Sequence, residues 1–166
     1  MGKLEKKVAL ITGAGSGIGK ATAKKFADEG ALVVVQDFNK ASAEEVSSTL
    51  PGLGHFALGG DVSKEQEMED VFSEVETRCE RLDVLVNNAG VSGSPEGLGS
   101  ITYESFMRML AVNMGGTFLC TRAALPLMNS GGSIVNLSSI AGLAGWGPAH
   151  YASAKGAILG FTRASA

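Results

Sequence analysis

The feature that most constrains this chain is an apolar run followed at once by a cluster of glycines and then by a helical pattern. The run from Val8 to Thr12 is typical of a buried parallel strand, Gly13 to Gly19 contains the glycines, and the helical stretch continues to about Glu29. Glycines permit positive φ angles and close approach of a ligand, and a helix N-terminus offers free N–H groups and a partial positive charge. The order strand, glycine turn, helix therefore predicts a phosphate-binding site.

The spacing of the glycines separates the known kinds of phosphate site. A G-x-G-x-x-G pattern fails, because position 18 is Ile and position 20 is Lys. A Walker loop ending at Gly19-Lys20 also fails, because positions 14 and 21 are both Ala. The pattern that remains is Thr12-Gly13-x-x-x-Gly17-x-Gly19, and a flexible turn without a ligand is the alternative interpretation.

An acidic residue ends the next apolar stretch. Residues 31–36 are typical of a second strand, and Asp37 follows them. An acid about 20 residues beyond the glycine turn can accept hydrogen bonds from ribose hydroxyls, and its charge repels a 2′-phosphate. Because Phe38, Asn39 and the loop residue Ser16 are all neutral, we expect NAD rather than NADP. A solvated turn carboxylate is the alternative.

Close to the C-terminus, Tyr151 and Lys155 stand four residues apart. In a helix this spacing places both side chains on one face, about 6 Å apart along the axis. A phenol with its ordinary pKa of about 10 keeps its proton at neutral pH, but a nearby ammonium lowers that pKa and favours the tyrosinate. Such a group can carry the proton between an alcohol and a carbonyl, and Ser139 could hydrogen-bond the substrate oxygen. Taken alone, the pair could equally be an ordinary pair on a helix surface.

The whole chain alternates strand and helix. We expect strands near 7–12, 31–36, 54–59, 82–87 and 133–138, and helices near 17–29, 40–49, 64–80, 102–129 and from 149 onward. This alternation predicts an α/β fold of three layers, a doubly wound parallel sheet in the order 3-2-1-4-5, built as a single domain over residues 1–166. Ligands then bind at the carboxyl ends of the strands, between the first and the fourth.

Composition narrows the classes of function. The net charge is −3 and the Lys and Arg residues are scattered, so nucleic acid is not an expected partner. The N-terminal residues lack the apolar stretch of a signal peptide, and no uninterrupted run approaches 18 apolar residues, so we expect no membrane association and a cytoplasmic protein. Neither His55 nor His150 has neighbouring ligands in the sequence, and no metal site is expected.

Together these motifs resemble the short-chain dehydrogenase/reductase family, with its Rossmann-type sheet. The resemblance runs from Lys7 to the C-terminus and rests on motifs in family order: Thr12-Gly-x-x-x-Gly-x-Gly19, Asp61-Val62, Asn87-Asn88-Ala89-Gly90, Asn113, Ser139 and Tyr151-x-x-x-Lys155. It implies an oxidoreductase that moves a hydride between NAD(H) and a secondary alcohol or carbonyl. The implied cofactor-binding residues are Gly13, Ser16, Gly17, Ile18, Gly19, Asp37, Asp61, Val62, Asn88, Ala89, Gly90, Tyr151 and Lys155.

The resemblance also implies individual roles around the cofactor. Asp61 would accept a hydrogen bond from the adenine amino group, while the backbone of Val62 helps to fix the ring. Asn88 and Ala89 would line the pocket near the ribose, and Gly90 would let the chain pass close to it. Without the resemblance, Asp61 or Ser63 could simply cap the helix that follows, and the asparagines could be turn residues.

The implied catalytic residues are Asn113, Ser139, Tyr151 and Lys155. Tyr151 would exchange the proton, Lys155 would lower its pKa and bind the nicotinamide ribose, and Asn113 would hold a water in a proton relay. Ser139 is preferred to Ser138 because the family serine stands three residues before a glycine, here Gly142. Its separation from Tyr151 is one residue shorter than the family pattern.

The chain departs from the family pattern at its end. Family members continue with the rest of the last helix, two more strands and a segment that covers the substrate, so we expect an incomplete domain with an exposed fifth strand. Stretches Gly93 to Gly99 and Leu143 to Pro148 would form only part of the substrate wall. The helices near 102–129 and 149–166 are those that pair between family subunits, and a homo-oligomer is expected.

Three functional hypotheses follow. The first is the NAD-dependent dehydrogenase or reductase, and the second is a truncated NAD-binding module without turnover. The third is a nucleotide-dependent methyltransferase with another glycine-rich loop, which leaves Asn113, Ser139, Tyr151 and Lys155 without a role.

Overall fold

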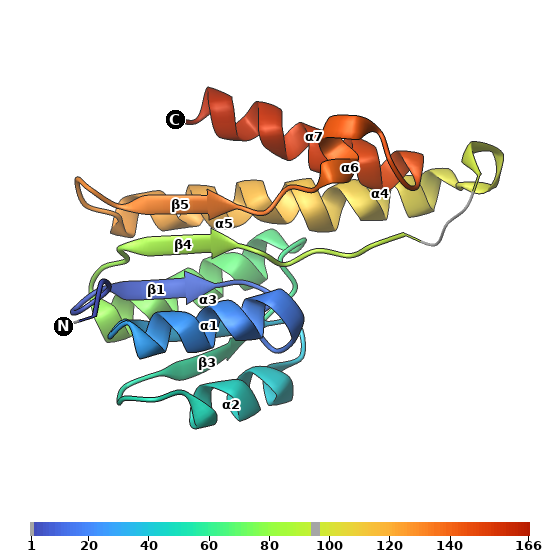
Figure 1. Cartoon of the computed structure of the whole chain (residues 1–166). Coiled ribbons are helices and arrows are strands. Elements are labelled where there is room, and N and C mark those ends of the chain that lie inside the picture. The colour runs from blue at the N-terminus through green and yellow to red at the C-terminus, as the bar shows by residue number, and fades with distance from the viewer. Residues whose placement is uncertain (1, 94–96) are drawn as a thin grey trace.

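A single parallel sheet organises the molecule, as the computed structural model in Figure 1 shows for residues 2–93 and 97–166. Its five strands lie in the order β3-β2-β1-β4-β5, which confirms the predicted topology. The strands are β1 (Val8–Ile11), β2 (Leu32–Asp37), β3 (Phe56–Gly59), β4 (Val84–Asn87) and β5 (Ser133–Asn136). Four of them lie within the ranges expected from the sequence, whereas β2 extends one residue further, because Asp37 pairs with Gly59 of β3.

Helices cover both faces of this sheet. The main helices are α1 (Gly17–Asp28), α2 (Lys40–Thr49), α3 (Glu65–Cys79), α4 (Tyr103–Leu110), α5 (Gly116–Ala124), α6 (Ile140–Ala144) and α7 (Ala149–Ala164). Alternate residues of β1 point to opposite faces: Ala9 and Ile11 pack with α1 and α2, whereas Val8 and Leu10 pack with α3 and α5. Because both faces are covered, β1 is buried along its whole length and reads as a continuous apolar run.

The helix expected over residues 102–129 is not α-helical throughout. After α4 the backbone widens into the π-helical turn η2 (Ala111–Gly115), continues as α5 and ends in the 3₁₀ turn η3 (Leu125–Leu127). Asn113 lies within η2, and its amide nitrogen donates to the backbone oxygens of Met109 and Val91, both at 3.1 Å. By donating to the Met109 oxygen, the Asn113 side chain competes with the backbone N–H that would pair with this carbonyl in a regular helix. This competition accounts for the π-helical turn.

The short helix α6 was not expected from the sequence. Ser139 is its N-cap, and the Ser139 hydroxyl oxygen accepts a hydrogen bond from the Ala141 N–H at 3.1 Å. Gly145, with φ of 68°, ends the helix after five residues. Five residues give too short a pattern for hydrophobic periodicity to reveal.

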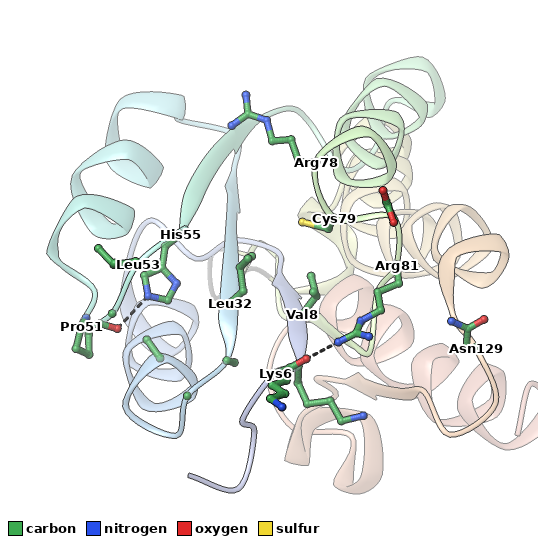
Figure 2. A pocket seen from close by; sticks show the side chains of 16 residues that line it. Lys6, Val8, Leu32, Pro51, Leu53, His55, Arg78, Cys79, Arg81 and Asn129 are labelled. Carbon is green, nitrogen blue, oxygen red and sulfur yellow. Dashed lines mark hydrogen bonds between the residues drawn. The ribbon is translucent and has the colours of Figure 1, made fainter. Parts of the chain in front are cut away.

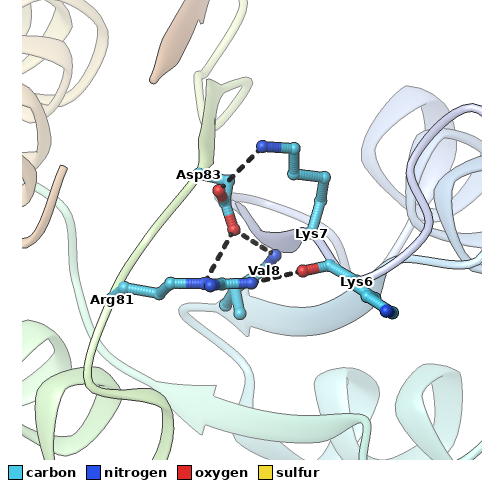
Figure 3. Close-up of polar contacts among 5 residues, drawn as sticks. All are labelled: Lys6, Lys7, Val8, Arg81 and Asp83. Atoms are coloured by element: carbon cyan, nitrogen blue, oxygen red, sulfur yellow. Dashed lines mark hydrogen bonds and ion pairs between the residues drawn. The ribbon is translucent and has the colours of Figure 1, made fainter. Parts of the chain in front are cut away.

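Hydrogen bonds and ion pairs of Asp83 connect the amino ends of β1 and β4. Figure 3 shows the Asp83 carboxylate accepting from the Val8 N–H at 2.9 Å and from the Lys7 ammonium at 3.1 Å, with the Arg81 guanidinium 3.3 Å away. Burial opposes ionisation of Asp83, but these donors and cations outweigh it and hold its pKa below the ordinary value. The ionised carboxylate therefore stabilises the folded chain.

Within the described part of the chain, no helix is long and apolar enough to cross a membrane.

Replacing this carboxylate tests the strand connection. We expect Asp83→Asn to lower the free energy of unfolding by about 1–3 kcal/mol at neutral pH, because the Val8 N–H and two cations lose an ionised partner. Because the pKa of Asp83 is lower in the folded chain than in the unfolded chain, its ionisation stabilises the fold fully above the unfolded pKa. This stabilisation is lost as pH falls through the pKa of the folded chain. Urea unfolding of variant and parent should therefore differ at about pH 7 and converge near about pH 3. Asp28→Asn, at an exposed position, is the control, and a pH-independent difference for Asp83→Asn would contradict the assignment.

Candidate nucleotide and catalytic site

A cavity of about 700 Å³ opens at the carboxyl ends of the strands, on the side that the doubly wound topology predicts. Segments that follow β1, β2, β3 and β4 all contribute to its wall. The residues expected at the cofactor that line it are Gly13, Ser16, Gly17, Ile18, Asp37, Asp61, Val62, Asn88, Ala89 and Gly90. These ten residues meet at one hollow although they are far apart in the sequence, whereas the predicted Gly19, Tyr151 and Lys155 do not line it.

The glycines of the first turn are required for two different reasons. Gly13 and Gly17 have φ of 62° and 54°, a region that residues with a Cβ rarely adopt. Gly19 has no such angle, but a Cβ there would lie 2.3 Å from the Gly13 oxygen and 2.6 Å from the Asn88 amide nitrogen. Helix α1 starts at Gly17, and its N-cap Ser16 makes no side-chain capping bond. The N–H groups of its first turn therefore face the cavity as potential anion donors.

Hydrogen bonds join this glycine turn to the segment after β4. The Asn88 amide nitrogen donates to the backbone oxygens of Thr12 and Gly13 at 2.8 and 3.0 Å. In return, the Thr12 hydroxyl oxygen accepts from the backbone N–H groups of Asn88 and Ala89 at 3.1 and 3.0 Å. Asn88 thus fixes the two walls of the cavity relative to each other, and its side chain is committed to the protein backbone.

The Asp37 carboxylate is held at the end of β2 by backbone donors. One oxygen accepts from the Gly15 N–H and the other from the Asn39 N–H, each at 2.9 Å. A Cβ on Gly15 would lie 2.9 Å from the carboxyl carbon of Asp37. Gly15 therefore provides room for the acid, a role that the sequence pattern did not show.

Asp61 and Val62 lie on the wall after β3. Oxygen Oδ1 of Asp61 accepts from both the N–H and the hydroxyl of Ser63, at 2.9 and 2.7 Å. Helix α3 begins at Glu65, and its N-cap Lys64 makes no side-chain capping bond, so neither Asp61 nor Ser63 caps it. Val62 is buried against Gly116, where a Cβ would lie 2.7 Å from a Val62 methyl carbon.

Several lining residues were not predicted. Gln36 is fully buried; its amide nitrogen donates to the Gly60 oxygen at 2.7 Å, and its Oε1 has no partner among the described residues. Phe38 is 79% exposed at the mouth of the cavity, and Arg108 reaches it from α4. An exposed aromatic beside the predicted acid Asp37 was a usable signal for Phe38. Nothing in the sequence singled out Gln36 or Arg108.

Helix α7 brings Tyr151 and Lys155 together as their spacing predicted. The Lys155 ammonium lies 6.0 Å from the centre of the Tyr151 ring and donates to the Leu137 oxygen at 2.8 Å. Lys155 is only 6% exposed, and burial lowers its pKa below the ordinary value. A largely buried cation beside a half-buried phenol is the arrangement that the proton-transfer hypothesis requires.

Asn113 faces the same point as Lys155. At Gly90 an added Cβ would lie 2.5 Å from Asn113 Oδ1 and 3.4 Å from the Lys155 ammonium nitrogen. Asn113 is fully buried, and its Oδ1 has no partner among the described residues. Gly90 thus leaves space at which an amide oxygen, an ammonium and the end of the cavity meet.

The two serines after β5 have different partners. The Ser138 hydroxyl donates to the Lys155 backbone oxygen at 2.7 Å, which commits it to α7. The Ser139 hydroxyl oxygen accepts from the Ala141 N–H, and its proton has no acceptor among the described residues. This difference favours Ser139 as the serine that contacts a substrate oxygen.

A second hollow, of about 650 Å³, lies at the opposite edge of the sheet (Figure 2). Its wall contains several cations, and three of them, Lys7, Arg78 and Arg81, pair with carboxylates. Arg81 contacts Asp83 and the Lys6 oxygen, and Arg78 pairs with Glu74 at 2.6 Å. This hollow is at the amino ends of the strands, away from the glycine turn, and contributes nothing to the site described above.

The fold is an α/β fold of the Rossmann type, with a cavity at the carboxyl ends of the strands and a Tyr and Lys pair beside it. Residues 7–166 match the family model described as "short chain dehydrogenase". The chain therefore belongs to the short-chain dehydrogenase family, and the match gives no support to the methyltransferase hypothesis.

Named relatives agree with this assignment. The chain is 40% identical over 166 residues to a meso-2,3-butanediol dehydrogenase of Serratia marcescens, covering 99% of this chain and 66% of the relative. It is 37% identical over 171 residues to a 3beta-hydroxysteroid dehydrogenase of Mediterraneibacter gnavus, covering 100% of this chain and 62% of the relative. It thus spans less than two thirds of the length of these curated relatives.

A solved structure is similar throughout the chain. The 3-ketoacyl-(acyl-carrier-protein) reductase of Brucella melitensis, complexed with NADH, superposes with a TM-score of 0.94 at 36% sequence identity. The match covers 99% of this chain and 70% of that structure.

A methyl group at position 19 tests the joint between the two cavity walls. We expect Gly19→Ala to destabilise the fold by about 1–3 kcal/mol and to weaken NADH binding at least about tenfold, because the new Cβ meets backbone and the Asn88 amide. Thermal unfolding and NADH fluorescence titration measure the two effects. The matched helical control is Gly160→Ala, where no atom lies within 4 Å of the added carbon. Equal behaviour of the two variants would show that space at position 19 is unimportant.

Proposed function

We propose that this chain provides the cofactor site and proton-transfer group of an oxidoreductase that moves a hydride between NAD(H) and a secondary alcohol or its carbonyl. The observation that carries the proposal is the buried Lys155 ammonium beside the Tyr151 ring, next to Gly90 at the end of the cavity. The printed names of the relatives, dehydrogenases and a reductase complexed with NADH, support it.

The residues of the cavity fit a dinucleotide. The glycine turn and the free N–H groups of α1 suit a pyrophosphate, and Asp61 and Val62 suit the adenine ring. Asn88 and Ala89 line the wall where the nicotinamide ribose would lie, and Gly90 permits close approach. When bound, NAD(H) supplies or accepts the hydride.

The chain's own residues handle the proton. Tyr151 gives its phenolic proton to the oxygen during carbonyl reduction and takes the hydroxyl proton during alcohol oxidation. The Lys155 ammonium lies beside the phenol ring, and the Ser139 hydroxyl donates to the substrate oxygen. Asn113, through its unpartnered Oδ1, holds a water that connects Lys155 with solvent. Lys155 also binds the nicotinamide ribose.

Asp37 selects NAD over NADP in this proposal. Its carboxylate is fixed by the Gly15 and Asn39 N–H groups at the cavity wall, where it can accept from ribose hydroxyls and repel a 2′-phosphate. Neutral Phe38 follows it and offers no counter-charge for a phosphate.

A second candidate function is an NAD-binding module without turnover. The supporting observation is that the chain spans only 66% and 62% of the two named curated relatives. Cofactor binding without any hydride transfer would distinguish this candidate from the first.

We also propose a homo-oligomer formed through the helices near 102–129 and 149–166. Exposed apolar side chains on α4 and α5 support it, namely Met107, at 44%, and Phe118, at 43%. Phe118 also meets Phe161 of α7 edge to face, with ring centres 6.3 Å apart, so the two helices present one continuous surface. The oxidoreductase proposal includes a small-molecule alcohol or carbonyl as substrate. A cytoplasmic location stays a prediction.

The two tyrosines of the chain allow a matched test of the proton carrier. We expect the parent to form NADH from NAD and at least one secondary alcohol in a panel of acyclic, cyclic and steroid alcohols. Tyr151→Phe should lower kcat by at least about 100-fold while NADH affinity changes by less than about threefold, because the phenolic oxygen acts on the reacting atoms. Absorbance of NADH and fluorescence titration give the two measurements.

Tyr103→Phe is the control, since Tyr103 is 78% exposed on α4. Equal rates for the two Phe variants would contradict the role of Tyr151. Clear NADH binding with no turnover of any alcohol by the parent chain would favour the binding module instead.

Removing the charge of Asp37 tests cofactor choice. We expect Asp37→Ser to lower the preference for NAD over NADP by at least about tenfold, because the repulsion of the 2′-phosphate and the ribose acceptor are both lost. Dissociation constants for NADH and NADPH measure the preference. Asp28→Ser, on the exposed side of α1, is the control, and an unchanged ratio in Asp37→Ser would exclude Asp37 as the selecting residue.

A further inference from the structure

Gly93 is a glycine for reasons of space. Its φ does not lie in the left-handed region, so its conformation is open to other residues. A Cβ at this position, however, would lie 2.4 Å from His150 Cε1 and 2.6 Å from His150 Nε2, with the Met109 methyl 3.3 Å away. The imidazole ring therefore occupies the volume that any side chain at position 93 would need.

The ring of His150 is buried, although it is not fully satisfied. His150 lies in the first turn of α7, directly before Tyr151, and is 2% exposed. Its Nδ1 is buried and has no hydrogen-bond partner among the described residues. An unpaired buried nitrogen opposes folding, so packing against its neighbours must support the position of the ring.

The segment that His150 contacts directly follows Asn88, Ala89 and Gly90, which line the cavity. The Val91 oxygen accepts from the Asn113 amide nitrogen, and Met109, which touches the space beside Gly93, also accepts from that amide through its backbone oxygen. Residues 91–93 are thus held by Asn113 at one end and by the His150 ring at the other. Their position depends on α7, the helix that also carries Tyr151.

We infer that His150 is a positioning residue: its ring sets the place of segment 91–93 relative to Tyr151, and so the width of the passage through which a substrate reaches the phenol. The inference rests on the proposed function, because it assigns residues 91–93 to the substrate side of the cofactor site. It also predicts that positions 93 and 150 depend on each other, since a Cβ at position 93 would displace the His150 ring.

A double-mutant cycle tests this dependence. The variants are Gly93→Ala, His150→Ala and the pair combined, with Gly160→Ala as control, because no atom lies within 4 Å of a Cβ there. Amide hydrogen exchange of residues 90–93 reports the position of the segment without any need for turnover. KM and kcat with the best alcohol of the panel show how the position of the segment affects substrate binding and turnover. NADH affinity shows whether the cofactor site has changed.

We expect each single variant to speed exchange in residues 90–93 at least about tenfold and to raise KM at least about fivefold, with NADH affinity within about threefold of the parent. In the double variant the added methyl enters the space left by the ring, so exchange and KM should return to within about threefold of the parent. The inference is overturned if the effects of the two single changes simply multiply in the double variant. It is also overturned if Gly93→Ala behaves as Gly160→Ala does.

A purely structural role gives a different pattern. It would speed exchange across α7 and the sheet alike and leave the KM of the folded fraction unchanged, which also overturns the inference. If the parent turns over no alcohol, the proposed function fails, whereas a coupled exchange pattern confined to residues 90–93 still establishes that His150 positions the segment.

Discussion

The hydrogen bonds between Thr12 and Asn88 are the constraint on which the site depends. β1 and β4 leave the sheet side by side, and the chain after each turns to an opposite wall of the cavity. The Asn88 amide holds the backbone of the glycine turn, while the Thr12 hydroxyl holds the backbone of Asn88 and Ala89. Because all four contacts involve backbone atoms, they fix the course of the chain itself. The shape of the cavity follows from this joint, and Gly19 must lack a side chain to allow it.

The buried ammonium of Lys155 creates a second dependence. Burial opposes its charge, and the Leu137 oxygen, directly after β5, accepts a hydrogen bond from it. The same region of α7 receives the Ser138 hydroxyl and packs against Gly142, where a Cβ would lie 2.6 Å from the Gly156 nitrogen. These contacts bring the turn after β5, which carries Ser139, against α7, which carries Tyr151 and Lys155. The charge is thus placed by the fold and not by the helical spacing alone.

The layered architecture was predictable from local pattern, because each strand is a short apolar run bounded by turn residues and each helix has its own period. The residues that line the cavity after the strands were predictable for a related reason. The carboxyl ends of parallel strands share one edge of the sheet, so residues after successive strands meet there. Other parts of the site were not predictable in this way. Arg108 from α4 and Gln36 from β2 line the cavity without any local signal. The π-helical turn contains Asn113, whose amide donates to the Met109 oxygen and to the Val91 oxygen, 22 residues away.

The sequence by itself determined the alternation of elements, the glycine turn, the acid after β2 and the Tyr and Lys spacing, since each depends on neighbours within a few residues. Only the tertiary structure decided why particular glycines are glycines. Gly15 makes room for Asp37, Gly90 for Asn113 and Gly93 for His150. Each of these pairs joins segments distant along the chain. Whether a side chain fits depends on atoms that only folding brings near, and no local pattern encodes that distance.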